Sequence, residues 1–184
     1  WVLAVGASIL LGSATMPNSK TFESFADFCT HKDNLTPEAR HTVEVLLSKA
    51  KTQECDRAQE TLTNLTELSL IRHQITDIKP LSKFTNLRKL NLSSNQIKDV
   101  QPLSGLTNLR FLILNFNQIS DVKPLSGLTN LTRLFLEANQ IVDASPLAGL
   151  TNLTTFSLAS NQVVDVTPLS RMTKLDFIYL GEIK

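Results

Sequence analysis

The segment LRKLNLSSNQIKDVQPLSGLTN, residues 87–108, is the pattern from which the fold of this 184-residue chain is predicted. It recurs with a period of 22 residues and without an insertion. Five complete copies, and a sixth that reaches Lys184 before it is complete, begin at Leu65, Leu87, Leu109, Leu131, Leu153 and Leu175. Such strict repetition predicts a solenoid in which each unit buries its apolar face only against its neighbours.

The first half of each repeat predicts a short strand. In residues 87–108, Leu90 and Leu92 alternate with polar residues, which is the period-two pattern of a half-buried strand. Stacked units then form a parallel sheet whose leucines point into the core. The second half, DVQPLSGL, is too short for a full α-helix and contains Pro102. We therefore expect extended or 3₁₀ structure on the opposite, convex face.

One asparagine recurs at the ninth position of the repeat, where the chain leaves the strand. A side-chain amide has both donors and acceptors, so a column of asparagines is able to satisfy backbone groups that would otherwise be buried and unpaired. The predicted structural column consists of Asn95, Asn117, Asn139 and Asn161. The first unit has His73 at this position, which we interpret as a structural substitute rather than a catalytic or metal-binding histidine.

The residues before the first repeat predict a helical cap over residues 19–64. The stretch TFESFADFC, residues 21–29, has apolar residues at helical spacing, and Thr36-Pro37-Glu38 is a typical helix start. We expect a pair of helices to cover the open edge of the first strand, because the ends of a solenoid need caps. The array itself spans residues 65–184. We expect it to continue beyond Lys184, and the alternative is that Ile183, which replaces the column asparagine, helps to end it.

The chain has two cysteines, Cys29 and Cys55, for which two interpretations are open. In an exported protein a small, even number of cysteines indicates a structural disulfide. His31 and His41 lie nearby in the sequence, so a zinc site is the alternative, although the spacing fits no common zinc pattern.

Residues 1–18 form a separate segment, either a signal-peptide remnant or a linker. Its apolar run, residues 1–11, is followed by the small residues Gly12-Ser13-Ala14, as at a signal-peptide cleavage site. The alternatives are an uncleaved membrane anchor and a buried helix, but a span needs about 20 residues. We therefore expect a secreted, periplasmic or cell-surface protein, in contact with a membrane only if the apolar segment remains as an anchor.

The repeats FTNLRKLNLSSNQIKDVQPLSG, residues 84–105, and LTNLTRLFLEANQIVDASPLAG, residues 128–149, resemble the internalin-type, 22-residue class of bacterial leucine-rich repeats. This resemblance implies a right-handed α/β solenoid with a concave parallel β-sheet, in an exported protein that binds a partner on that concave face. The segment TPEARHTVEVLLSKAKTQECDRA, residues 36–58, resembles the cap of uncharacterised exported cyanobacterial leucine-rich-repeat proteins. No ligand-contacting residue is transferred from the family, because such positions vary freely.

The candidate binding residues are therefore those that the repeat leaves unexplained on the concave face. The third, fifth and seventh positions of each unit project from the sheet, and the eighth lies at its rim. Large apolar side chains at these positions, with adjacent charges, are typical of protein-interaction hot spots. The candidates are Phe111, Ile113, Phe116, Arg133, Phe135, Glu137, Phe177 and Tyr179. Two plainer interpretations stay open: aromatic residues favour strands in any case, and Phe177 and Tyr179 are also candidates for contacts to a seventh unit.

The sequence favours a binding protein over an enzyme. The three histidines assemble no catalytic constellation, and there is no phosphate-binding glycine loop. Aspartates recur at period 22 from Asp77 to Asp165, but turn capping explains them better than a calcium ladder. We expect no cofactor, no metal and, with a net charge of +1, no nucleic-acid partner. The predicted function is non-enzymatic binding of a protein, or of a glycan, on the concave face. The alternative is a structural scaffold or spacer that supports a further domain.

Overall fold

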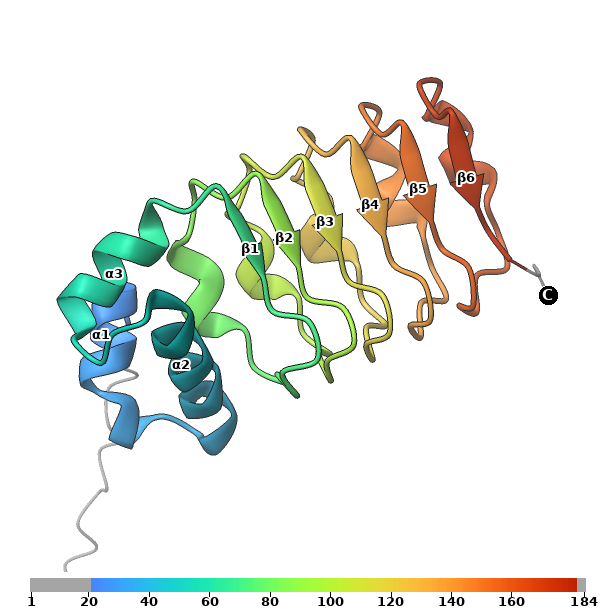
Figure 1. Cartoon of the computed structure of the whole chain (residues 1–184). Helices are drawn as coiled ribbons and strands as arrows, with labels where there is room; N and C mark the ends of the chain where they lie inside the picture. The colour runs from blue at the N-terminus through green and yellow to red at the C-terminus, as the bar shows by residue number, and fades with distance from the viewer. Residues whose placement is uncertain (1–20, 182–184) are drawn as a thin grey trace, which may run out of the picture.

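The computed structural model describes residues 21–181, so the predictions made for residues 1–18 and for Ile183 lie outside the described residues. One parallel sheet of six strands, arranged in chain order, runs the length of the molecule, with a helical cap at its β1 end (Figure 1). The strands are β1 Glu67–Ser69, β2 Lys89–Asn91, β3 Phe111–Ile113, β4 Arg133–Phe135, β5 Thr155–Ser157 and β6 Phe177–Tyr179. The predicted solenoid is confirmed.

Each strand consists of the third to fifth positions of its repeat, and the register is the same throughout. Lys89 lies between Glu67 and Phe111 of the neighbouring strands. The fourth-position residues of β1 to β5 are stacked in the core and are at most 5% exposed. The third and fifth positions therefore face away from the core, because successive side chains of a strand point to opposite sides.

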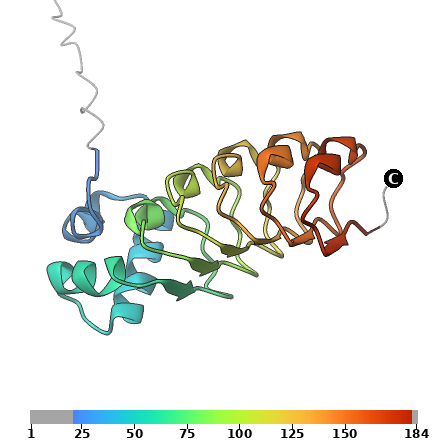
Figure 2. The same cartoon turned by 90° about the horizontal axis from the view of Figure 1, so that it is seen from above.

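The convex face is built from 3₁₀ segments, one in each of the first five repeats. Figure 2 shows them along the outer side of the arc, with the sheet along its inner side. Each begins two residues after an aspartate; for example, the carboxylate of Asp99 accepts the N–H of Gln101 at 2.8 Å. Leu103 and Leu106 close the core beneath this face and are fully buried. The five segments are η2 Lys79–Lys83, η3 Gln101–Leu103, η4 Lys123–Leu125, η5 Ser145–Gly149 and η6 Thr167–Arg171.

The asparagines of the ninth position link each repeat to the one before it. The amide nitrogen of Asn117 donates to the carbonyl of Leu114 at 2.9 Å and to that of Leu92, in the preceding unit, at 3.1 Å. Its oxygen accepts the N–H of Ile97, also in the preceding unit, at 3.1 Å. One buried side chain thus pairs backbone groups of two units at the bend after the strand. Asn95, Asn139 and Asn161 repeat this arrangement.

The cap contains three α-helices where the sequence predicted a pair, and the third helix corrects that expectation. The helices are α1 Phe25–Thr30, α2 Pro37–Ala50 and α3 Cys55–Thr63, with a 3₁₀ turn, η1 Lys32–Asn34, between the first two. In α3 only Ala58 and Leu62 are buried, so its sequence offers few apolar residues, although these two are at helical spacing from Cys55. It is held instead by its contacts with α1 and α2.

The cap and the repeats share one hydrophobic core. The Phe25 ring of α1 lies 5.7 Å from the Phe84 ring of the first repeat's return segment, measured between centroids. On α2, Thr42 donates its hydroxyl to the Asp77 carbonyl at 2.6 Å. The cap is therefore packed and hydrogen-bonded onto the first repeat, as the prediction that helices close this end of the array requires.

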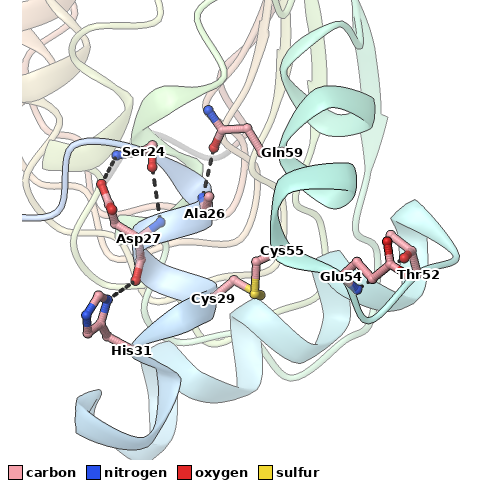
Figure 3. Close-up of a disulfide and its surroundings, with 9 residues drawn as sticks. All are labelled: Ser24, Ala26, Asp27, Cys29, His31, Thr52, Glu54, Cys55 and Gln59. Atoms are coloured by element: carbon pink, nitrogen blue, oxygen red, sulfur yellow. Dashed lines mark hydrogen bonds between the residues drawn. A yellow bond between two sulfur atoms is a disulfide. The ribbon is translucent and has the colours of Figure 1, made fainter.

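Cys29 and Cys55 form a disulfide between α1 and the first residue of α3 (Figure 3). Their Cα atoms lie 5.6 Å apart, within the usual range for a disulfide. Beside the bond, the Gln59 side chain of α3 accepts the N–H of Ala26 of α1 at 2.8 Å. The predicted disulfide is confirmed. The zinc alternative is wrong because the two sulfur atoms are bonded to each other.

The last strand has a neighbour on one side only among the described residues. Ile178 takes the core position of the repeat yet is 42% exposed, whereas its equivalents in β2 to β5 are fully buried. Within residues 21–181, none of the helices has the length and apolar character that crossing a membrane requires.

We expect Asn117→Ala to lower the free energy of unfolding by about 1–3 kcal/mol, because it leaves the buried N–H of Ile97 without its partner. The two carbonyls that Asn117 also binds each keep a bond from a neighbouring asparagine of the column. Urea denaturation measures the loss. The control is Gln140→Ala at an exposed position of the next repeat's turn, which should change stability by less than about 0.5 kcal/mol. Equal effects of the two substitutions would contradict the structural role of the column.

We expect replacement of both Cys29 and Cys55 by serine to lower the free energy of unfolding by about 3 kcal/mol, the entropy of closing a loop of this length. The measurement compares urea denaturation of the oxidised native chain with that of the double variant. Thiol titration of the folded, unreduced chain is the control. Free reaction of both thiols there would show that the disulfide does not form.

Candidate protein-interaction surface

The centre of the concave sheet has an aromatic pair on neighbouring strands. The Phe111 ring of β3 and the Phe135 ring of β4 lie 5.6 Å apart between centroids and are tilted by 54°. Ile113 lies beside Phe135 in the parallel register and on the same face of the sheet. These three half-buried side chains are called the concave cluster below.

Two cations flank the concave cluster at Phe111. The Lys89 ammonium of β2 lies 5.5 Å from the centroid of the Phe111 ring, and the Arg133 guanidinium carbon of β4 lies 5.6 Å from it. Both distances are within the range of cation–π attraction. Lys89 also forms an ion pair with Glu67 of β1 at 3.3 Å. The ring therefore positions two positive charges beside the apolar centre of the sheet.

Phe116 lies at the rim of the same repeat in an unusual backbone conformation. Its φ is +57°, in the left-handed region, and its side chain is 54% exposed. The turn imposes this conformation on the eighth position of each of the first five units, because the equivalent residues also have positive φ: Arg72, Ser94, Ala138 and Ser160. Bulky residues are disfavoured there, so neither the turn nor core packing requires phenylalanine at this position.

Of the remaining candidates, one lies beside the concave cluster and two lie apart from it. Glu137 of the fourth unit is adjacent, and its carbonyl accepts the N–H of Phe116 at 2.8 Å. Phe177 and Tyr179 of β6 are 59% and 54% exposed. They are separated from β4 by Thr155 and Ser157 of β5 and do not belong to the concave cluster.

Comparison with known proteins decides the family. A family model described as leucine-rich repeats (2 copies) matches residues 62–105 and 107–149. The crystal structure of internalin C2 from Listeria monocytogenes is similar over 66% of this chain, with 43% sequence identity and a TM-score of 0.64. The chain is an internalin-type leucine-rich-repeat protein. The crystal structure of an internalin (InlF) of the same organism is similar over 78% of the chain, with 28% identity and a TM-score of 0.54.

This internalin-type chain spans little more than half the length of these two structures, 54% of internalin C2 and 57% of InlF. A comparison with curated proteins gives no match. The family resemblance predicted from the repeats is thus confirmed, whereas the resemblance of the cap to exported cyanobacterial proteins stays a prediction.

A second asparagine column of this internalin-type array was missed by sequence reasoning, which considered only the asparagine of the ninth position. The Asn108 side chain donates to the Thr85 carbonyl of the preceding repeat at 2.9 Å. At the end of the fifth repeat Lys174 replaces the asparagine and donates to the Asn152 side chain at 2.8 Å. The exact period was the signal that could have revealed it. The same bond is made by Asn86, Asn130 and Asn152.

Lys89 is the candidate surface residue that sequence reasoning left out. Lys89 holds the third position of its repeat, as Phe111 does in the next one, and this equivalence could have identified it as a surface residue. The contact depends on the conformations of two flexible side chains, however, which the repeat pattern does not determine. The structure adds Lys89 to the candidate surface because its ammonium lies over the Phe111 ring.

The histidines and aspartates have structural partners. The His41 imidazole lies 2.7 Å from the His73 carbonyl, at the junction of cap and array. Partial burial, and then the Lys49 charge, lower the pKa of His73. The hydrogen bond from the Ser145 side chain lowers the pKa of Asp143, as expected for a turn-capping carboxylate. Within residues 21–181, no three histidine, cysteine or acidic side chains gather as metal ligands would.

We expect Phe116→Asn to raise the free energy of unfolding by up to about 1 kcal/mol, because asparagine tolerates the left-handed conformation better than phenylalanine. Thermal unfolding measures the change. Ser94→Phe introduces phenylalanine at the equivalent position of the preceding repeat and should lower the free energy of unfolding by a similar amount. A clear loss of stability in Phe116→Asn would show that the ring is a packing element of the fold.

Proposed function

We propose that this chain is a non-enzymatic protein-interaction module that holds a protein partner on the concave face of its third and fourth repeats. The observation that carries the proposal is Phe116, which is more than half exposed in a backbone conformation unfavourable to it. The equivalent residues of the other described units are smaller or polar. A large apolar side chain that the fold does not need is best explained by a contact outside the chain.

The concave cluster supports the same interpretation. Half-buried aromatic rings with an adjacent arginine are typical of the residues that dominate protein interfaces. The core leucines beneath them are fully buried, so they hold the outward side chains on a rigid, closely packed sheet. A preformed surface loses little conformational entropy when a partner binds, which favours affinity.

The disulfide supports an extracellular location for this module. Disulfides persist in oxidising compartments and are rare in the cytosol of most organisms. Cys29 and Cys55 are bonded within the cap, and the related structures are internalins. We therefore place the proposed interaction outside the cell, with a secreted or surface-exposed partner.

The test compares partner capture by the native chain with capture by the double variant Phe116→Ser, Phe135→Ser. Each immobilised chain is incubated with the extracellular fraction of the source organism and with proteins of the surfaces that the organism colonises. The retained proteins are quantified by mass spectrometry. Any protein that depends on the two phenylalanines is purified and titrated by calorimetry. We expect the double variant to raise its Kd about 100-fold or more, as for loss of two hot-spot residues.

The matched control is Val142→Ser, because Val142 is 56% exposed but lies in the segment that leads to the convex face. Circular dichroism and thermal unfolding confirm that each variant is folded. If the native chain, the control and the double variant retain the same proteins with the same affinity, the concave face is not the binding surface. The structural-scaffold alternative would then be favoured.

A further inference from the structure

We propose that the partner on the concave face is an acidic protein segment, in which a carboxylate lies beside an apolar side chain. This inference rests on the proposed function and adds the chemistry of the partner to it. It commits the apolar side chain to the concave cluster and the carboxylate to Arg133, whose guanidinium lies over the Phe111 ring.

The charged side chains on the concave positions of the first four repeats are two cations and two carboxylates. They are Glu67, Lys89, Arg133 and Glu137. Lys89 is paired with Glu67 at 3.3 Å. Arg133 is therefore the cation beside the concave cluster that is left for a partner of opposite charge.

Arg133 is available to a partner. Its side chain is exposed and makes no ion pair with any other residue of the described range 21–181. Arg88 and Arg110 are also exposed, but they hold the second position of their repeats and point away from the face of Phe111, because successive side chains of a strand alternate. The proposal therefore depends on Arg133 alone.

Arg133 connects the charges to the apolar cluster. Its guanidinium lies over the Phe111 ring, 5.6 Å from the centroid, and the ring is itself in contact with Phe135. Stacking on a ring restricts the guanidinium while leaving its edge free to bind a carboxylate through two hydrogen bonds. A carboxylate bound there lies next to Phe111, so the residue beside it in the partner is placed against the concave cluster.

A hollow beside Lys89 provides room for the backbone of such a segment. It has a volume of about 300 Å³ and opens on the sheet side of β1 and β2. It is lined by Glu67, Leu68, Ser69, Lys89 and Asn91, and the polar groups of Ser69 and Asn91 suit the backbone of an extended peptide. The carboxylate of the segment is assigned to Arg133 and not to this hollow, because Glu67 lines the hollow. A polyanionic glycan is a poorer match, because it has no apolar side chain to place on the aromatic rings.

The experiment selects a phage-displayed library of random linear peptides on the immobilised native chain. We expect the enriched peptides to contain an aromatic or aliphatic residue with aspartate or glutamate within a few positions. A synthetic copy of the most enriched peptide is then titrated against three variants, Arg133→Glu, Phe135→Ser and Arg171→Glu. Arg171 is an exposed cation of the convex segment η6, so Arg171→Glu is the matched control for charge reversal.

We expect Arg133→Glu to raise the Kd of the acidic peptide at least about tenfold, as for reversal of one charge in a close pair. Arg171→Glu should leave the Kd unchanged, and high salt should weaken binding to the native chain. Phe135→Ser should also weaken binding, which locates the peptide on the concave cluster. Thermal unfolding establishes that each variant is folded.

The outcomes that overturn this inference differ from those that overturn the proposed function. Enriched peptides that depend on Phe135 but lack acidic residues, or bind Arg133→Glu unchanged, contradict the acidic partner and leave the concave interaction surface intact. Displacement of the peptide by a heparin oligosaccharide that itself binds more tightly would replace the acidic segment with an anionic glycan. No enrichment, or enriched peptides indifferent to Phe135→Ser, would contradict both.

Discussion

The asparagine that bonds to two successive repeats is the interaction on which the rest of the structure depends. At the end of each strand the chain bends sharply, and the bend leaves backbone groups in the core without a backbone partner. Asn117 pairs such groups of its own unit and of the preceding one at once. Because one side chain must reach both units, every unit has the same length and register. An insertion within a repeat would break these bonds.

This constraint also explains which positions of the repeat are free to take residues that serve binding. The asparagines and inward leucines are committed to the fold, so substitutions there are costly. The outward third, fifth and eighth positions supply neither the inward leucines nor the asparagines of the column. In the third and fourth repeats these positions hold aromatic rings and an arginine, whereas the fifth repeat has Thr155, Ser157 and Ser160. The concave cluster is therefore a local difference in outward side chains on a scaffold whose repeats are otherwise alike.

Sequence periodicity predicted much of the fold, and its failures have physical causes. The alternation of leucines predicted the strands, and the proline after a capping aspartate predicted the 3₁₀ segments. The helix α3 was missed because its apolar residues, although helically spaced, are few, and only Ala58 and Leu62 are buried. Its stability comes from packing against α1 and α2 and from the Cys29–Cys55 bond, which are tertiary contacts.

The sequence by itself determined the solenoid, the column and which large apolar residues face outward, because these follow from a period of 22 and an alternation of two. Only the tertiary structure decided how the outward residues meet. Lys89 and Arg133 are 44 residues apart, yet both lie over the Phe111 ring, because the parallel register brings equivalent positions of three repeats side by side. The contacts of long side chains across strands depend on their rotamers and their neighbours, and no repeat pattern specifies those.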